Sequence, residues 1–97
     1  MGVLRNARQE VKTPVGRIDI LTPTDIYELK TYRQAKHAIG QLLSYSYFYP
    51  EHELNLVLFD VPEQANLVHL KAICRRLQIG LIVAEIIPRK SLTPKRA

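Results

Sequence analysis

Residues 16–30 of this chain read GRIDILTPTDIYELK, and this stretch decides the expected fold. The apolar-rich segment at 17–21 is followed by the turn-forming residues TPTD and then by IYELK, which is rich in β-forming side chains. Upstream, TPVG at 13–16 places proline and glycine at the second and fourth positions of a type I turn. We therefore expect three strands joined by two tight turns, at residues 7–12, 17–21 and 26–32.

Downstream of these strands, the pattern predicts a first helix and then a strand. Apolar side chains recur at three- and four-residue steps between residues 33 and 47, which is typical of a helix, and Pro50 would stop it. The run LNLVLF at 54–59 is short and apolar, as in a buried strand.

A second helix and a last strand complete the expected order. The helix would begin at Asp60 or Pro62, continue to about residue 77 and be capped by Gly80. LIVAEII at 81–87 would form another buried strand. The predicted fold class is α/β, with a mixed sheet and the element order β-β-β-α-β-α-β.

Length and charge bound the domain organisation and the class of partner. The 97 residues, 46% of them hydrophobic, are enough for one domain at 1–88, followed by a basic tail at 89–97. Of the net charge of +5, residues 1–12 carry +2 and the tail +4, which leaves −1 between them. Basic ends suit DNA, although solvated tails that keep a protein soluble explain the charge equally well.

Several classes of protein find no support in the sequence. No apolar run is long enough to cross a bilayer, and the N-terminus lacks the apolar core of a signal peptide, so we expect an intracellular (cytoplasmic) protein. Cys74 is the only cysteine, which excludes an internal disulfide and a cysteine-based zinc site. No glycine-rich phosphate loop is present.

The two turns predict a row of carboxylates. If Lys12 faces Arg17 across the first hairpin, and Leu21 faces Ile26 across the second, the acids of three strands fall into line. They form a row of Glu10, Asp19 and Glu28, beside a second row of Lys12, Arg17 and Lys30.

Like charges so close would repel, and a divalent cation would remove the repulsion. Two carboxylates and a nearby backbone carbonyl are oxygen ligands that suit Mg²⁺ or Mn²⁺. Such an ion polarises a phosphoryl oxygen and lowers the pKa of bound water. The alternative is that these are ordinary solvated charges, with Glu28 and Lys30 paired on an exposed sheet face.

Three blocks of this sequence resemble the PD-(D/E)xK nuclease superfamily, particularly its RecB-like branch and the small viral and intron-associated endonucleases. GRIDI at 16–20 is similar to the strand that carries the first metal-binding aspartate, and ELK at 28–30 to the ExK strand. QLLSY at 41–45 is similar to the QxxxY helix. The resemblance covers roughly residues 9–87 and implies a restriction-endonuclease-like core.

This resemblance implies a Mg²⁺-dependent DNA endonuclease and gives each site residue a role. Asp19, Glu28 and the backbone carbonyl of Leu29 would hold the metal, and Lys30 would position the nucleophile or the phosphate. Gln41 and Tyr45, one helical turn apart, would hydrogen-bond the lysine, the water or a DNA phosphate. Many relatives carry a further acid on a preceding helix, for which this chain has almost no room. Either Glu10 replaces that acid from its strand or the acid is dispensable, which leaves the number of metals open.

Two further expectations concern partners. Residues expected to contact DNA are Arg17, Arg33, Lys36, Arg89 and Lys90. Cutting both strands needs two sites or a turnover of one site between them. We expect a homo-oligomer, a dimer or tetramer, with the aromatic cluster at 45–49 or the second helix between subunits. The alternative function is a catalytically inactive nuclease-like module that binds nucleic acid or a protein.

Gly40 lies inside the first predicted helix, where glycine costs about 1 kcal/mol relative to alanine. Close approach of a strand or of a DNA backbone would account for it, as would a helix that simply tolerates glycine.

Overall fold

The computed structural model describes residues 6–85, and its element order is the expected β-β-β-α-β-α-β. The strands are β1 (Arg8–Thr13), β2 (Gly16–Leu21), β3 (Asp25–Thr31), β4 (Glu53–Phe59) and β5 (Ile79–Val83). A 3-10 turn, η2 (Tyr32–Gln34), leads into helix α1 (Ala35–Phe48), and helix α2 (Val68–Arg76) precedes β5. The predicted tail at 89–97, with Arg89 and Lys90, lies outside the described residues.

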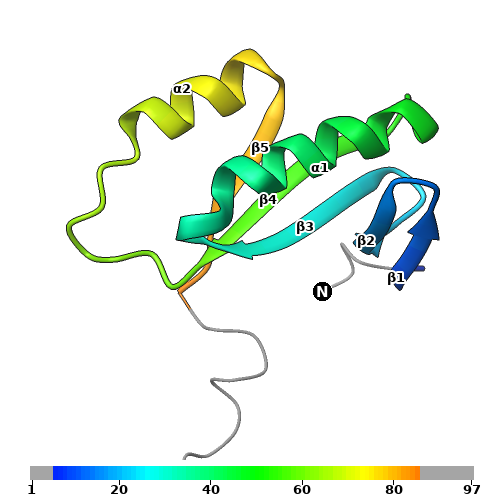
Figure 1. Ribbon diagram of the computed structural model, residues 1–97, viewed down its shortest axis with the longest axis horizontal. Helices are drawn as coiled ribbons and strands as arrows, with labels where there is room; N and C mark the ends of the chain where they lie inside the picture. The colour runs from blue at the N-terminus through cyan, green and yellow to red at the C-terminus, as the bar shows by residue number, and fades with distance from the viewer. Residues whose placement is uncertain (1–5, 86–97) are drawn as a thin grey trace, which may run out of the picture.

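The five strands form one mixed sheet in the order β1-β2-β3-β4-β5. β1, β2 and β3 are antiparallel neighbours, whereas β3, β4 and β5 run parallel and are connected through α1 and α2 (Figure 1). The α/β class and the mixed sheet are therefore confirmed.

Both tight turns form where the sequence predicts them. In the first, the Thr13 hydroxyl accepts a hydrogen bond from the Val15 N–H at 3.1 Å, and Gly16 has a φ of 137°, which favours glycine. In the second, the Thr22 N–H donates to the Asp25 carbonyl at 2.9 Å. The turns set the registers Lys12–Arg17 and Leu21–Ile26, as predicted.

The predicted register fails farther along β2 and β3. Only Ile20–Tyr27 and Leu21–Ile26 pair, so the predicted partners Asp19–Glu28 and Arg17–Lys30 are not ladder neighbours. The acidic row is also interrupted on β1, where Glu10 has a left-handed φ of 51°. β2 and β3 therefore separate beyond the second turn, and Asp19 lies where they part.

α1 covers one face of the sheet and forms most of the core. Its buried side chains are spaced as the periodicity predicts, and they pack on the alternate leucines of β4. The core residues from these two elements are Ala35, Ala38, Ile39, Leu42, Tyr45, Leu54, Leu56 and Leu58.

The second helix begins later than predicted, at Val68 instead of at Asp60 or Pro62. Asp60 has a φ of 57°, which a helix cannot accommodate, and the side chain of Asn66 accepts a hydrogen bond from the Val68 N–H at 2.9 Å. The predicted cap at Gly80 is also wrong, because Gln78 takes the left-handed position after the helix, with a φ of 60°.

β5 begins at Ile79, so Gly80 lies within the strand. A Cβ at Gly80 would lie 2.8 Å from Oδ1 of Asn55 on β4, so a larger residue here would require the Asn55 side chain to move. The strand was expected to be buried, but it is an edge strand in which Ile82 and Val83 are 45% and 41% exposed. Its predicted end at 86–87 lies outside the described residues.

The opposite face of the sheet has no helix over it within residues 6–85 (Figure 1). On β4, residues between the buried leucines are only half-buried. No helix in the described part of the chain is long and apolar enough to cross a membrane.

Candidate active site

Glu28 is the buried charge around which the candidate site is built. It lies in the middle of β3 and is 0% exposed. Neither of its carboxylate oxygens has a hydrogen-bond partner among the described residues. Nζ of Lys30, two residues along the same face, lies 3.4 Å from its Oε2. Buried carboxylates normally accept several hydrogen bonds, so this one is left short of partners.

Asp19 reaches β3 through its side chain. Its Oδ2 accepts a hydrogen bond from the Leu29 backbone N–H at 2.8 Å. The carboxylate thus takes the place of the backbone carbonyl of β2 that would accept from the Leu29 N–H in a regular ladder. In a strand the N–H and C=O of one residue point to the same neighbour, so the Leu29 carbonyl also faces the separation between β2 and β3.

The pKa of Glu28 is raised from 4.5 to about 7. Burial is the main cause, and the negative charge of Asp19 adds to it, while Lys30 partly offsets both. The Glu28 carboxyl is therefore close to half-protonated at neutral pH. A cation bound beside it would favour the charged form.

Tyr45 and Gln41 come to the same region from α1. The Tyr45 hydroxyl donates to the carbonyl of Arg17 at 2.7 Å and accepts from Nε2 of Gln41 at 3.2 Å. Burial raises the pKa of Tyr45, and the negative charge of Glu28 raises it further. Tyr45 thus fastens α1 to the β1–β2 hairpin, beside the acids.

Gln41 retains an unused acceptor. Its Oε1 is buried and has no hydrogen-bond partner among the described residues. The structure gives no hydrogen bond between Lys30 and either Gln41 or Tyr45 in this part of the chain, so the contact expected between the lysine and the QxxxY pair is not made directly.

Other predicted site residues lie around this centre. Glu10 is exposed on β1, and its charge contributes to the raised pKa of Tyr45. Arg17, Arg33 and Lys36 are exposed on β2, η2 and α1, where they are open to a ligand.

The donor set fits a divalent cation in chemical type. Two carboxylates, one of them buried without hydrogen bonds, and the Leu29 carbonyl are hard oxygen ligands. Within residues 6–85, however, no three His, Cys, Asp or Glu side chains are grouped to hold a metal ion. An ion here would therefore complete its shell with the backbone carbonyl and water.

The chain is similar to proteins of Acanthamoeba polyphaga mimivirus whose names describe them as KilA-N domain-containing proteins. One is 42% identical over 74 residues, which is 76% of this chain and 30% of the relative. A second is 37% identical over 73 residues, 75% of this chain and 20% of the relative. A third is 44% identical over 72 residues, 74% of this chain and 20% of the relative.

The matched segment therefore spans only 20% to 30% of these viral proteins, and their names refer to the longer proteins as wholes. No family model matches this chain, and no solved structure does.

Two backbone groups of the site were not foreseen from the sequence: the Leu29 N–H that holds Asp19, and the Arg17 carbonyl that holds Tyr45. Backbone partners leave no mark in residue identity. The nearest signal was Gly16, since a Cβ there would lie 3.1 Å from the Tyr45 hydroxyl.

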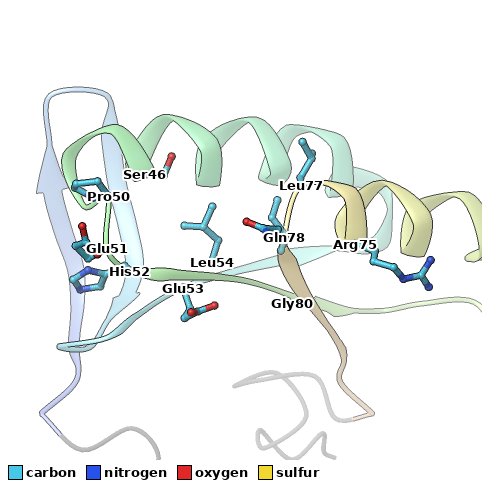
Figure 2. A pocket seen from close by; sticks show the side chains of 11 residues that line it. Ser46, Pro50, Glu51, His52, Glu53, Leu54, Arg75, Leu77, Gln78 and Gly80 are labelled. Atoms are coloured by element: carbon cyan, nitrogen blue, oxygen red, sulfur yellow. The ribbon is translucent and has the colours of Figure 1, made fainter.

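A depression of about 650 Å³ lies elsewhere, between the ends of α1 and α2 and the beginnings of β4 and β5 (Figure 2). Figure 2 shows Leu54 and Gln78 at its centre and Arg75 pointing away along α2. None of the predicted site residues lines it. We assign no function to this depression on the basis of its volume.

Proposed function

We propose that this domain is a metal-dependent DNA endonuclease of the PD-(D/E)xK type, with a restriction-endonuclease-like core. The observation that carries the proposal is Glu28, a buried carboxylate without a hydrogen bond, flanked by Asp19 and Lys30 where two strands separate. Lys30 and partial protonation compensate only part of the cost of burying this carboxylate, and an unsatisfied buried group costs about 1–3 kcal/mol. A divalent cation provides the compensation.

Asp19, Glu28 and the Leu29 carbonyl would hold a Mg²⁺ or Mn²⁺ ion. When bound, the ion would polarise the scissile phosphate and lower the pKa of an attacking water. Asp19 is already oriented for this role by its hydrogen bond to Leu29.

Lys30 would orient the phosphate or the nucleophile. Its side chain is 22% exposed, so a lysine here can present its ammonium group to a ligand while most of its stem stays in the protein. In the metal-free protein it neutralises Glu28; once a cation takes that task, the ammonium is free to bind a phosphoryl oxygen.

DNA as substrate rests on charge and on the chemistry of the site. Arg17, Arg33 and Lys36 are exposed cations on β2, η2 and α1, and the chain carries a net charge of +5. These groups suit a phosphodiester backbone.

The decisive experiment is nicking of supercoiled plasmid in Mg²⁺ or Mn²⁺ by the wild type, Lys30→Met and Glu28→Gln. We expect each variant to lose at least about 100-fold in rate, the effect of removing one group that stabilises the transition state. Glu53→Gln and Lys71→Met change exposed residues away from the site and should cut as the wild type does.

Cutting that persists in excess EDTA, or in both site variants, would refute the assignment. A wild type that binds plasmid with the same affinity as its variants, yet never cuts it, would instead establish the alternative of an inactive nuclease-like module.

A further inference from the structure

Gly40 lies on the open side of α1. A Cβ built there would meet no heavy atom within 4 Å in the described part of the chain. No strand of the described chain approaches Gly40, so close approach of a strand does not explain the glycine. A DNA backbone, or a helix that simply tolerates glycine, remains. Packing within residues 6–85 thus gives no reason to give up the helix-stabilising methyl of alanine.

The surface around Gly40 is hollowed. A depression of about 420 Å³ lies between α1 and the first hairpin turn, lined by Val15, Lys36, His37, Gly40, Gln41 and Ser44. Lys36, Gly40 and Ser44 follow one another at four-residue steps, so they lie along one face of the helix. The glycine is at the centre of this row.

The charge of this surface has one sign. Residues 32–50 contain no aspartate or glutamate, while Arg33 and Lys36 are exposed cations. The depression itself offers the ammonium of Lys36, the imidazole of His37, the hydroxyl of Ser44 and a bare stretch of helix backbone, groups that complement a phosphodiester strand.

Gln41 links the depression to the first hairpin. Its side chain lines the depression and donates to the Tyr45 hydroxyl, which in turn donates to the Arg17 carbonyl on β2, two residues before Asp19. A strand lying along the depression would therefore pass beside the hairpin that carries Asp19.

We propose that the sugar–phosphate backbone of a DNA strand lies against α1 at Gly40, with Lys36 contacting a phosphate beside the scissile one. This assignment rests on the proposed function and names the surface that carries its substrate. The missing side chain at Gly40 lets the strand approach the helix more closely than any other residue would allow. Lys36, one turn earlier, supplies the countercharge.

The test separates helix stability from DNA binding. In Gly40→Ala, the melting temperature should rise by about 4–8 °C, because alanine favours the helix and clashes with nothing. Its affinity for a short labelled DNA duplex, measured by fluorescence anisotropy in EDTA, should fall about tenfold, the equivalent of roughly 1.4 kcal/mol. A variant that is more stable and yet binds less well cannot be explained by misfolding.

Lys36→Ala provides an independent measurement. It should weaken binding and reduce the slope of log affinity against log salt by about 0.9, the contribution of one phosphate contact. Lys71→Ala, an exposed lysine on α2, is the matched control and should keep the wild-type slope.

If Gly40→Ala melts higher and binds DNA as the wild type does, the helix merely tolerates glycine and the proposal is wrong. The proposal is also wrong if Lys36→Ala and Lys71→Ala change the slope of log affinity against log salt by the same amount. Because these measurements need no cleavage, a protein that fails to cut DNA but loses affinity in Gly40→Ala would refute the nuclease and keep the DNA surface. A protein that cuts DNA, and whose Gly40→Ala variant keeps the wild-type affinity for DNA, would support the nuclease and refute the DNA surface at Gly40.

Discussion

The carboxylate of Asp19 accepts the backbone N–H of Leu29 at 2.8 Å, across a point where their two strands are no longer paired. A side chain thus performs what the β2 backbone would do in a regular ladder. The bond places Asp19 beside Glu28 without making the two residues direct cross-strand neighbours. One carboxylate oxygen of Asp19 has a structural task, and the other is left for a ligand.

Asp19→Ala and Asp19→Asn should therefore differ in stability. The alanine removes the acceptor of the Leu29 N–H and should lower the free energy of unfolding by about 1–2 kcal/mol. The asparagine keeps an acceptor oxygen and removes a charge near Glu28, so it should be as stable as the wild type. Both should lose metal-dependent cleavage. Urea denaturation in EDTA checks this; equal stability of the two variants would show that the hydrogen bond contributes nothing.

Glu28 should make the metal-free protein less stable as pH rises. Its folded-state pKa of about 7 lies above the 4.5 expected when unfolded, so the native state binds the extra proton. Below pH 4.5 both states are protonated and Glu28 has no effect; between 4.5 and 7 the unfolding free energy falls, by at most about 3 kcal/mol.

Glu28→Gln should abolish this fall and be more stable than the wild type above pH 7, whereas exposed Glu53→Gln should follow the wild type. Added Mg²⁺ should stabilise only a protein with an ionised Glu28, so its effect on melting should grow with pH and vanish in Glu28→Gln. A Mg²⁺ effect of the same size in both proteins would place the ion elsewhere.

Tyr45→Phe should loosen α1 from the β1–β2 hairpin. The ring keeps its packing, but the Arg17 carbonyl loses its donor and Gln41 its acceptor. We expect a loss of about 1–2 kcal/mol in unfolding free energy. Tyr47, which is 80% exposed, provides the control, and Tyr47→Phe should be neutral. A neutral Tyr45→Phe would mean that the hydrogen bond has no net value.

The sequence predicted the meander well because turn chemistry is local. Thr13 and Thr22 form their turns with residues two or three positions away, and these turns set the first pairs of each ladder. The separation of β2 from β3 could not be predicted, because it depends on a side chain competing with the backbone for one N–H. The late start of α2 has a similar cause: Asn66 and a left-handed Asp60 outweigh an apolar pattern that extends further.

Burial was predicted less well at the far edge of the sheet. Apolar runs at α2 and β5 indicated a closed core, yet Val68, Ile73 and Ile82 are between 45% and 64% exposed. An apolar pattern shows which side chains prefer burial, but it does not show which of them the folded chain covers. The aromatic cluster divides in the same way, with Tyr45 buried and Tyr47 on the surface.

These exposed side chains lead to a prediction about assembly. We expect the domain to form a symmetric dimer through α2 and β5, because a closed pair would bury both apolar surfaces. Ile73→Lys and Ile82→Lys should each yield a monomer in light scattering and keep the circular dichroism of the wild type. Leu43→Lys, at an equally exposed position on α1, should remain dimeric. A monomeric wild type at micromolar concentration would contradict this.

One half of the sheet consists of the antiparallel strands β1, β2 and β3, which are adjacent in sequence, and the other of the parallel strands β3, β4 and β5, which are far apart in sequence. Glu28 lies on β3, the strand that belongs to both halves. β1, β2 and β3 connect through tight hairpin turns, and hairpins form in about 1–10 μs, whereas β3 pairs with β4 only after α1 has crossed between them. Until then Glu28 faces water, because Leu56 on β4 is its ladder neighbour and α1 is its cover. Dehydration of this carboxyl therefore belongs to the slow part of folding. Refolding in a stopped-flow experiment should slow as pH rises from 4.5 to 7, between the unfolded and folded pKa values of Glu28, and then stay constant, and Glu28→Gln should remove this dependence.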